Sequence, residues 1–166
     1  MPSVLLLDDN DDFRHVLKEL LETLGYDVCA FDNGQAALNY LAAPGSAVDI
    51  ILCDIHMPDM DGFTFLRHVR ENPALAHICI IAASGSREDR PQALAEGANA
   101  YVVKPFNVRD LVALLEKCPP APAPTPVAQP AAHADPPTVR PEEETREAKA
   151  VRIEDDIPNG QADSDD

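Results

Sequence analysis

Basic residues are scarce in this chain, and their scarcity excludes several kinds of partner. The sequence has 13 lysines and arginines against 29 aspartates and glutamates, which gives a formal charge of −16. Both parts of the chain share this excess: residues 1–118 carry a net charge of −9 and residues 119–166 a net charge of −7. Because nucleic acids and anionic membranes attract basic surfaces, we expect the protein to bind no nucleic acid and no membrane.

Long apolar runs and paired cysteines are also missing. No stretch approaches the ~20 apolar residues of a membrane-spanning helix, and the first residues lack the basic segment of a signal peptide. The cysteines show no C-x-x-C pair and no zinc-ligand spacing; they are Cys29, Cys53, Cys79 and Cys118. We therefore predict a cytoplasmic protein with reduced cysteines, which act mainly as small hydrophobic residues within strands.

Short apolar runs alternate with segments of helical periodicity through the first 118 residues. The runs cover residues 4–7, 26–30, 50–53, 78–83 and 100–103, and the helical segments cover about 11–24, 34–41, 63–72, 87–96 and 107–115. This alternation requires a parallel sheet with helices on both faces. We predict an α/β, flavodoxin-like, doubly wound fold of five strand–helix units with strand order 2-1-3-4-5.

The composition changes abruptly after residue 118. Residues 119–166 hold ten of the sixteen prolines and few apolar residues. Such a composition favours an extended linker and a disordered acidic tail over a second core. We therefore divide the chain into a domain at 1–118 and a disordered, Pro-rich, acidic tail at 119–166. The alternative is a tail segment that folds on a partner.

Charged residues follow three of the predicted strands directly. Asp8 and Asp9 end the first run, Asp54 ends the third, and Lys104 follows the fifth. Since the carboxyl ends of parallel strands share one edge, and strands one and three are neighbours, we expect these side chains to converge. Carboxylate oxygens with room for water suit Mg²⁺, and the chain lacks the histidine and cysteine ligands that zinc prefers.

The expected arrangement suits phosphoryl transfer. Asp54 can attack as a carboxylate nucleophile and form an aspartyl phosphate, while a metal ion neutralises the developing charge. Lys104 can pair with the transferred phosphoryl group as a point charge. Ser84, at the end of the fourth apolar run, can donate a hydrogen bond to it.

Taken in order and at their spacings, these residues resemble the receiver domain of two-component response regulators across residues 1–118. The matching elements are Leu7-Asp8-Asp9, Asp54 with Met57-Pro58 and Asp61-Gly62, the hydroxyl at the end of strand four, and Lys104-Pro105-Phe106. The resemblance implies that Asp54 accepts a phosphoryl group from a histidine kinase or a histidine phosphotransfer protein.

The resemblance also implies a set of metal ligands. Asp9 and Asp54 would bind Mg²⁺ directly, and the backbone carbonyl of His56 would supply the third protein ligand. Asp8 would act mainly through water.

A switch is implied in the same way. Tyr101 matches the family's switch aromatic, whose ring turns inward as Ser84 moves toward the phosphoryl group. The Lys104–Pro105 peptide bond is expected to be cis. Counting forward from Asn72-Pro73 selects Ser84 as the family's hydroxyl residue, whereas counting backward from Lys104 selects Ala82. Ser84 is the preferred match because a hydroxyl ends the strand there, although it requires a shorter loop before the fourth helix.

The sequence thus predicts a phospho-accepting receiver without a DNA-binding output domain. It would catalyse only phosphoryl transfer to Asp54 and its own dephosphorylation. Its output would be a downstream protein bound at the face of helix four and strand five, or onward relay of the phosphoryl group. One alternative is a receiver-like interaction module that is never phosphorylated and acts through its tail. Another is an Asp-nucleophile phosphatase or dehalogenase, which the sequence Asp54-Ile55-His56 disfavours because it lacks the D-x-D general acid.

Overall fold

A computed structural model describes residues 1–119 of the protein. Its five strands form one parallel sheet in the order β2-β1-β3-β4-β5, so the predicted fold and strand order are confirmed. The elements are β1 (Ser3–Leu7), α1 (Asp11–Thr23), β2 (Asp27–Phe31), α2 (Gly34–Ala42), β3 (Ile50–Asp54), α3 (Gly62–Glu71), the 3₁₀ helix η1 (Pro73–Leu75), β4 (Cys79–Ser84), α4 (Arg90–Ala95), β5 (Ala100–Val103) and α5 (Val108–Lys117). The predicted tail, apart from its first residue, lies outside the described residues.

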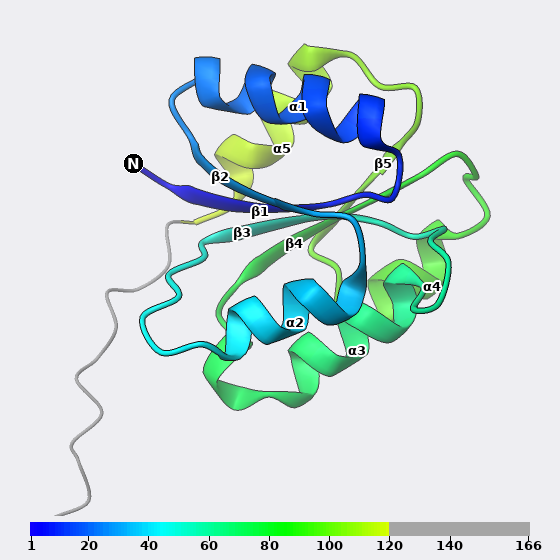
Figure 1. The fold of residues 1–166 in the computed structure, drawn as a ribbon. Coiled ribbons are helices and arrows are strands. Elements are labelled where there is room, and N and C mark those ends of the chain that lie inside the picture. Colours follow the sequence, from blue (N-terminus) through cyan, green and yellow to red (C-terminus); the bar gives the residue numbers. More distant parts are fainter. Residues whose placement is uncertain (120–166) are drawn as a thin grey trace, which may run out of the picture. The chain divides into compact units, whose positions relative to one another are not determined.

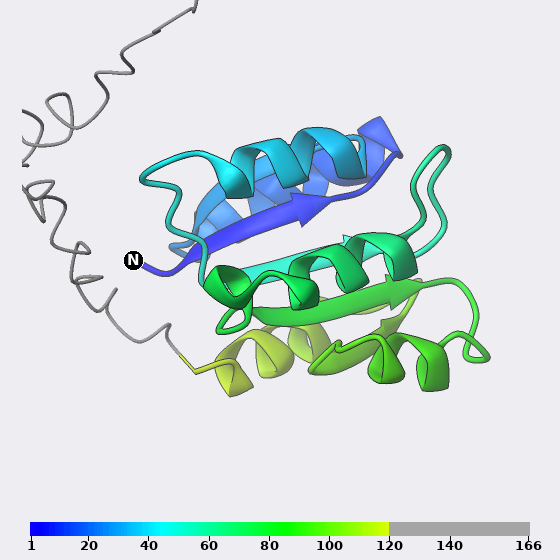
Figure 2. The same cartoon turned by 90° about the horizontal axis from the view of Figure 1, so that it is seen from below.

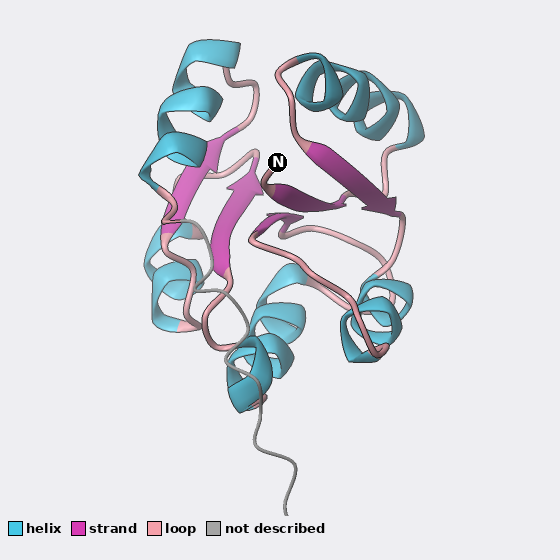
Figure 3. Ribbon diagram, turned by 90° about the vertical axis from the view of Figure 1, so that its left-hand side faces the viewer, coloured by secondary structure: helices cyan, strands magenta, loops and turns pink. Residues whose placement is uncertain are grey.

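The sheet lies between two layers of helices. Helices α1 and α5 cover one face and α2, α3 and α4 cover the other (Figure 1). Figure 2 looks onto the face that carries α2, α3 and α4, and Figure 3 shows the twisted strands between the two helical layers. The strands alternate between the two cores: Leu5 and Leu7 pack toward α2 and α3, while Val4 and Leu6 pack toward α1 and α5. A strand covered on both faces must be apolar throughout, which explains the short continuous runs in the sequence.

Strand register brings the carboxyl ends of β1 and β3 to the same level of the sheet. Leu7, the last residue of β1, pairs with Cys53, and Asp54 then pairs with Ala83 of β4. The residues that follow β1 therefore emerge beside Asp54.

Four of the five α-helices begin with a side-chain cap. The oxygen of the capping residue accepts a hydrogen bond from the backbone N–H three residues ahead, which satisfies one free donor of the first turn. The capping residues are Asn10, Asn33, Asp61 and Asn107. Asp89, at the same position before α4, makes no such bond, so its carboxylate is available for other contacts.

Three expectations about helices are wrong in detail. α4 begins at Arg90, three residues later than predicted, because the preceding residues form the loop after β4. The spacing of apolar residues predicts stripes that include Val16 and Val108, but Val16 is 65% exposed and Val108 is 44% exposed. An amphipathic helix buries only one face against a flat sheet, and in α1 the buried residues of the predicted stripe are Leu17 and Leu21.

The expectation of reduced cysteines is wrong for one pair. Cys79, the first residue of β4, forms a disulfide with Cys118, which caps the end of α5. Their Cα atoms are 5.7 Å apart, within the usual disulfide range. The two residues are 39 positions apart in sequence, so only the fold reveals that they meet. Cys29 and Cys53 are free, and none of the helices in residues 1–119 is long and apolar enough to cross a membrane.

Candidate functional site

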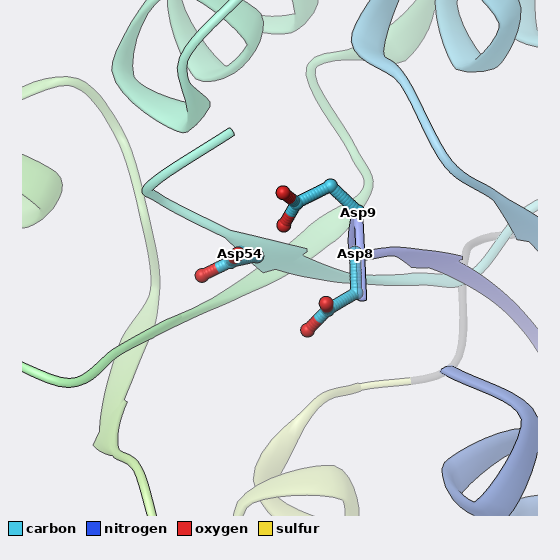
Figure 4. Close-up of side chains that lie close together, drawn as sticks. All are labelled: Asp8, Asp9 and Asp54. Carbon is cyan, nitrogen blue, oxygen red and sulfur yellow. The ribbon is translucent and has the colours of Figure 1, made fainter. Parts of the chain in front are cut away.

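Three carboxylates meet at the carboxyl edge of the sheet. Asp54 is the last residue of β3, and Asp8 and Asp9 follow the last residue of β1 directly (Figure 4). One oxygen of each lies within 4.8 Å of the others. Asp8 is 2% exposed and Asp54 is 7% exposed, while Asp9 is exposed to solvent. The strand order thus brings together the acids that the sequence placed at two separate strand ends.

Lys104 supplies the positive charge beside this cluster. Its Nζ atom lies 2.6 Å from Oδ2 of Asp8 and 3.3 Å from Oδ1 of Asp54. Its backbone N–H donates to the carbonyl of Ser84 at 2.8 Å, and the Lys104–Pro105 bond is cis as expected. The ammonium also lies 4.6 Å from the centroid of the Phe13 ring. These contacts place one amine between the two buried carboxylates.

Asp8 accepts three hydrogen bonds that hold it in place. Its Oδ1 accepts a hydrogen bond from the backbone N–H of Asn10 at 2.9 Å, and its carbonyl oxygen accepts one from Arg14 at 2.7 Å. Its other carboxylate oxygen accepts from Lys104. A buried carboxylate is tolerated when its charge is paired and hydrogen-bonded in this way.

The negative charge of the Asp54 carboxylate is less well compensated than that of Asp8. Burial raises the pKa of its carboxyl group above the ordinary value, Lys104 opposes this rise, and the charges of Asp8 and Asp9 add to it. Three carboxylates facing one ammonium leave a formal excess of two negative charges. Oxygen ligands carrying that charge suit a divalent cation of the Mg²⁺ type. No other cluster of this kind was found within residues 1–119.

Gly62 allows the loop after β3 to fold back beneath Asp54. A Cβ atom at this position would lie 2.4 Å from the carbonyl oxygen of Asp54 and 2.7 Å from Cα of Ile55. The Gly62 N–H instead donates to the carbonyl of Ile55 at 2.8 Å. The Asp61-Gly62 pair of the sequence motif therefore combines the cap of α3 with the only residue type that fits this close approach.

Ser84, and not Ala82, occupies the edge of the sheet beside the acids. Ser84 is the last residue of β4 and is fully buried, whereas Ala82 pairs with Cys53 inside the sheet. The Ser84 hydroxyl donates to Oδ2 of Asp89 at 2.6 Å and accepts from the N–H of Ser86 at 3.1 Å. Its hydroxyl is therefore engaged by the loop that follows the strand.

Asp89 was not among the residues singled out from the sequence. Besides Ser84, its Oδ2 contacts Nε2 of His56 at 2.7 Å. These hydrogen bonds, that from Ser84 first, hold the pKa of Asp89 below its ordinary value. No local signal in the sequence marks Asp89, because Gln92, whose N–H an aspartate cap at this position would bind, keeps its backbone donor.

The remaining predicted residues lie next to the cluster. His56 lies in the loop after β3, and its side chain is 64% exposed with the ring turned to Asp89. Tyr101, in β5, is partly buried, and its hydroxyl donates to the carbonyl of Ser86. The backbone-ligand role of His56 and the switch role of Tyr101 remain predictions.

A five-stranded parallel sheet with buried aspartates and a lysine at its carboxyl edge defines a receiver-type signalling domain. The family model of the response regulator receiver domain matches residues 4–116. The chain therefore belongs to the response regulator receiver domain family, which acts in two-component signalling.

Curated relatives share the same region. The transcriptional regulatory protein CpxR of Escherichia coli is 37% identical over 113 residues, which cover 68% of this chain and 47% of CpxR. The DNA-binding transcriptional regulator NtrC of Escherichia coli is 32% identical over 114 residues, which cover 69% of this chain and 24% of NtrC. The chain therefore matches half or less of the length of these two relatives.

Solved structures of single receivers match over nearly their whole length. Vibrio cholerae CheY4 has a TM-score of 0.66 and 30% identity, covering 72% of this chain and 99% of CheY4. Thermotoga maritima TrrA, in complex with Mg²⁺ and BeF, has a TM-score of 0.64 and 29% identity, covering 72% and 100%. The receiver domain of a Pseudomonas aeruginosa sensor histidine kinase, with magnesium in its active-site cleft, has a TM-score of 0.63 and 30% identity, covering 70% and 96%. The acid cluster is thus the acidic magnesium-binding pocket of a receiver.

Proposed function

We propose that this protein is a phospho-accepting receiver in which Asp54 takes a phosphoryl group from a histidine kinase or a histidine phosphotransfer protein. The observation that carries the proposal is the position of Lys104, whose ammonium lies within 3.3 Å of carboxylate oxygens of both Asp8 and Asp54. The ammonium of a lysine at this position can pair with the negative charge of an incoming phosphoryl group. Asp54, at the end of the central strand β3, is the acid beside this lysine.

The transfer needs positioning and charge compensation more than covalent help from other residues. A carboxylate oxygen of Asp54 attacks phosphorus, the P–N bond to the donor imidazole breaks, and its electron pair returns to the imidazole nitrogen. Asp9, Asp54 and the backbone carbonyl of His56 would hold Mg²⁺, and Asp8 would act mainly through water. The ion, when bound, would neutralise negative charge on the transferred group. Lys104 would then exchange part of its contact with Asp54 for a phosphoryl oxygen.

The output of such a module would be protein binding or onward relay to another histidine. Phosphorylation would shift the surface of α4 and β5, which Tyr101 and the loop after β4 connect to the site, and a downstream protein would read that surface. We place the protein in the cytoplasm, where histidine kinases present their phosphorylated histidines. Within residues 1–119 no output domain accompanies the receiver fold.

One experiment tests the proposal directly. The full chain is incubated with acetyl phosphate and Mg²⁺, and its intact mass is compared with that of Asp54→Asn and of Asp59→Asn, an acid in the same loop. We expect one phosphoryl adduct on the wild type and on Asp59→Asn, and none on Asp54→Asn or after chelation of Mg²⁺. An adduct that persists in Asp54→Asn contradicts the assignment, and no adduct on the wild type favours a non-phosphorylated interaction module. Sustained hydrolysis of a small phosphate ester would favour a phosphatase instead.

A further inference from the structure

The loop between β4 and α4 engages the Ser84 hydroxyl in hydrogen bonds. A serine hydroxyl carries a single proton and can donate one strong hydrogen bond at a time. In this structure that bond goes to Oδ2 of Asp89, at 2.6 Å. The same oxygen is contacted by Nε2 of His56 at 2.7 Å. Ser84 therefore cannot donate to a phosphoryl group on Asp54 without leaving Asp89.

The local backbone explains why Asp89 reaches Ser84. Asp89 stands before the first residue of α4, where an aspartate usually caps its own helix. Its backbone is helical (φ −73°, ψ −16°) rather than extended as at the other capping positions, and its side chain makes no capping bond. Its side chain is only 18% exposed. The carboxylate is thus committed to Ser84 and His56 rather than to its own helix.

We propose that Asp89 is a positioning residue that latches the Ser84 hydroxyl in the unphosphorylated protein and so opposes its contact with a phosphoryl group on Asp54. The latch rests on the proposed function of Asp54. His56 completes the latch, since its ring N–H donates to the same oxygen of Asp89 and keeps the carboxylate turned toward Ser84. A hydrogen bond to a charged acceptor is stronger than one between neutral groups. The free energy needed to break the bond between Ser84 and Asp89 therefore lowers the affinity of the site for a phosphoryl group.

The test measures binding of beryllofluoride, a phosphoryl mimic, to the full chain at saturating Mg²⁺ by NMR titration. Asp89→Ala should bind the mimic about tenfold more tightly than the wild type, because Ser84 no longer has to leave a charged acceptor. Asp89→Asn keeps an acceptor oxygen without the charge and should gain less. Glu88→Ala removes a neighbouring exposed charge that does not touch Ser84, and it should match the wild type.

A double-mutant cycle with Ser84→Ala separates the latch from simple removal of charge. In the Ser84→Ala background, Asp89→Ala should change the affinity for beryllofluoride by less than about threefold, because no hydroxyl is left to release. Equal gains in both backgrounds would show a purely electrostatic effect and overturn the latch. An Asp89→Ala variant that binds no more tightly than Glu88→Ala would overturn it as well.

The same titrations keep this proposal distinct from the phosphorylation of Asp54. If the wild type binds beryllofluoride and takes up phosphate while Asp89→Ala changes nothing, the latch alone is wrong. If the wild type neither binds the mimic nor takes up phosphate, the proposed function fails and the latch fails with it. Mg²⁺ affinity measured without the mimic should be the same in Asp89→Ala and Glu88→Ala, since a latch on Ser84 acts only on the phosphoryl group.

Discussion

The two ends of the parallel sheet are built on opposite principles. At the amino end the backbone groups that begin the strands are paired: Asp49 accepts from the N–H of Ser3 at 2.7 Å through its side chain, and its carbonyl accepts from the N–H of Cys79. At the carboxyl end, three acids face the single ammonium of Lys104. The amino end of the sheet has its polar groups paired, and the carboxyl end keeps an excess of negative charge.

Arg70 and the disulfide stabilise the amino end of the sheet further. The Arg70 guanidinium donates to the carbonyls of Ala76, Ile78 and Gly97 at 2.9–3.0 Å. The Cys79–Cys118 disulfide joins the start of β4 to the end of α5 at the same end of the sheet. Stabilising contacts are thus concentrated at the end opposite the site, so a carboxyl edge that is poor in compensating charge can be tolerated.

Reducing the disulfide should have the largest effect on stability. A cross-link that closes a loop spanning 39 positions is expected to contribute about 4 kcal/mol to the free energy of unfolding. Urea unfolding with and without reductant measures this loss, and phosphoryl uptake should be unchanged because the disulfide lies at the other end of the sheet. In Cys118→Ser, reductant should have no effect. Equal unfolding curves for the oxidised and reduced wild type would show that the disulfide does not stabilise the amino end of the sheet.

Removing the ammonium from the acid cluster should be the next largest change. Lys104→Met leaves the buried carboxylates of Asp8 and Asp54 without their cation and should cost about 3 kcal/mol when Mg²⁺ is absent. Added Mg²⁺ should restore part of this loss, because a bound cation supplies the missing positive charge. Lys18→Met, which removes an exposed lysine of α1, serves as the control in the same urea titrations. A loss that is the same with and without Mg²⁺ would mean that the metal does not share the site of Lys104.

The hydrogen bonds of Arg70 should stabilise the amino end of the sheet without a covalent bond. Arg70→Met leaves three carbonyls without their donor and should lower the free energy of unfolding by about 2 kcal/mol. Phosphoryl uptake from acetyl phosphate should stay at the wild-type level. Arg67→Met, on the same helix, removes a solvent-exposed pair with Glu96 and should change stability little. If the folded Arg70→Met variant took up less phosphoryl group than the wild type, the two ends of the sheet would be coupled.

The fold and the acid cluster could be predicted from sequence because their signals are local. Each strand is a short apolar run that ends in a polar residue, and parallel strands place those ends on one edge. The positions of Asp8, Asp54 and Lys104 follow from this rule alone. Ser84 needed the structure, since two counts along the sequence selected different residues.

The missed features depend on contacts between distant segments. Arg70 binds carbonyls up to 27 positions away, and Cys79 meets Cys118 only after β4 and α5 are in place. The Asp89 contact depends on how a short loop turns after β4, which apolar spacing does not encode. The wrong assignment of Val16 to the core arose because periodicity gives the apolar face of a helix but not the width of the surface it packs against.

Asp54→Asn should give the smallest change, and its sign depends on pH and on metal. Burial raises the pKa of Asp54, so without Mg²⁺ the folded protein binds this proton more tightly than the unfolded chain does. The wild type therefore loses stability from this group as pH rises through the interval above the ordinary value of 3.8. Asp54→Asn removes that loss, and its advantage in the free energy of unfolding should grow from acidic to neutral pH.

Adding Mg²⁺ at neutral pH should reverse the order, because a cation bound by the ionised acids stabilises the wild type and binds the variant less well. Urea unfolding between pH 4 and pH 7, in chelator and in excess Mg²⁺, measures both effects, with Glu116→Gln as the exposed control. A wild type that equals or exceeds Asp54→Asn in stability at neutral pH in chelator would show that Lys104 alone compensates the cluster. The charged groups at the carboxyl edge would then be as fully paired as the polar groups at the amino edge, and the contrast between the two ends of the sheet would disappear.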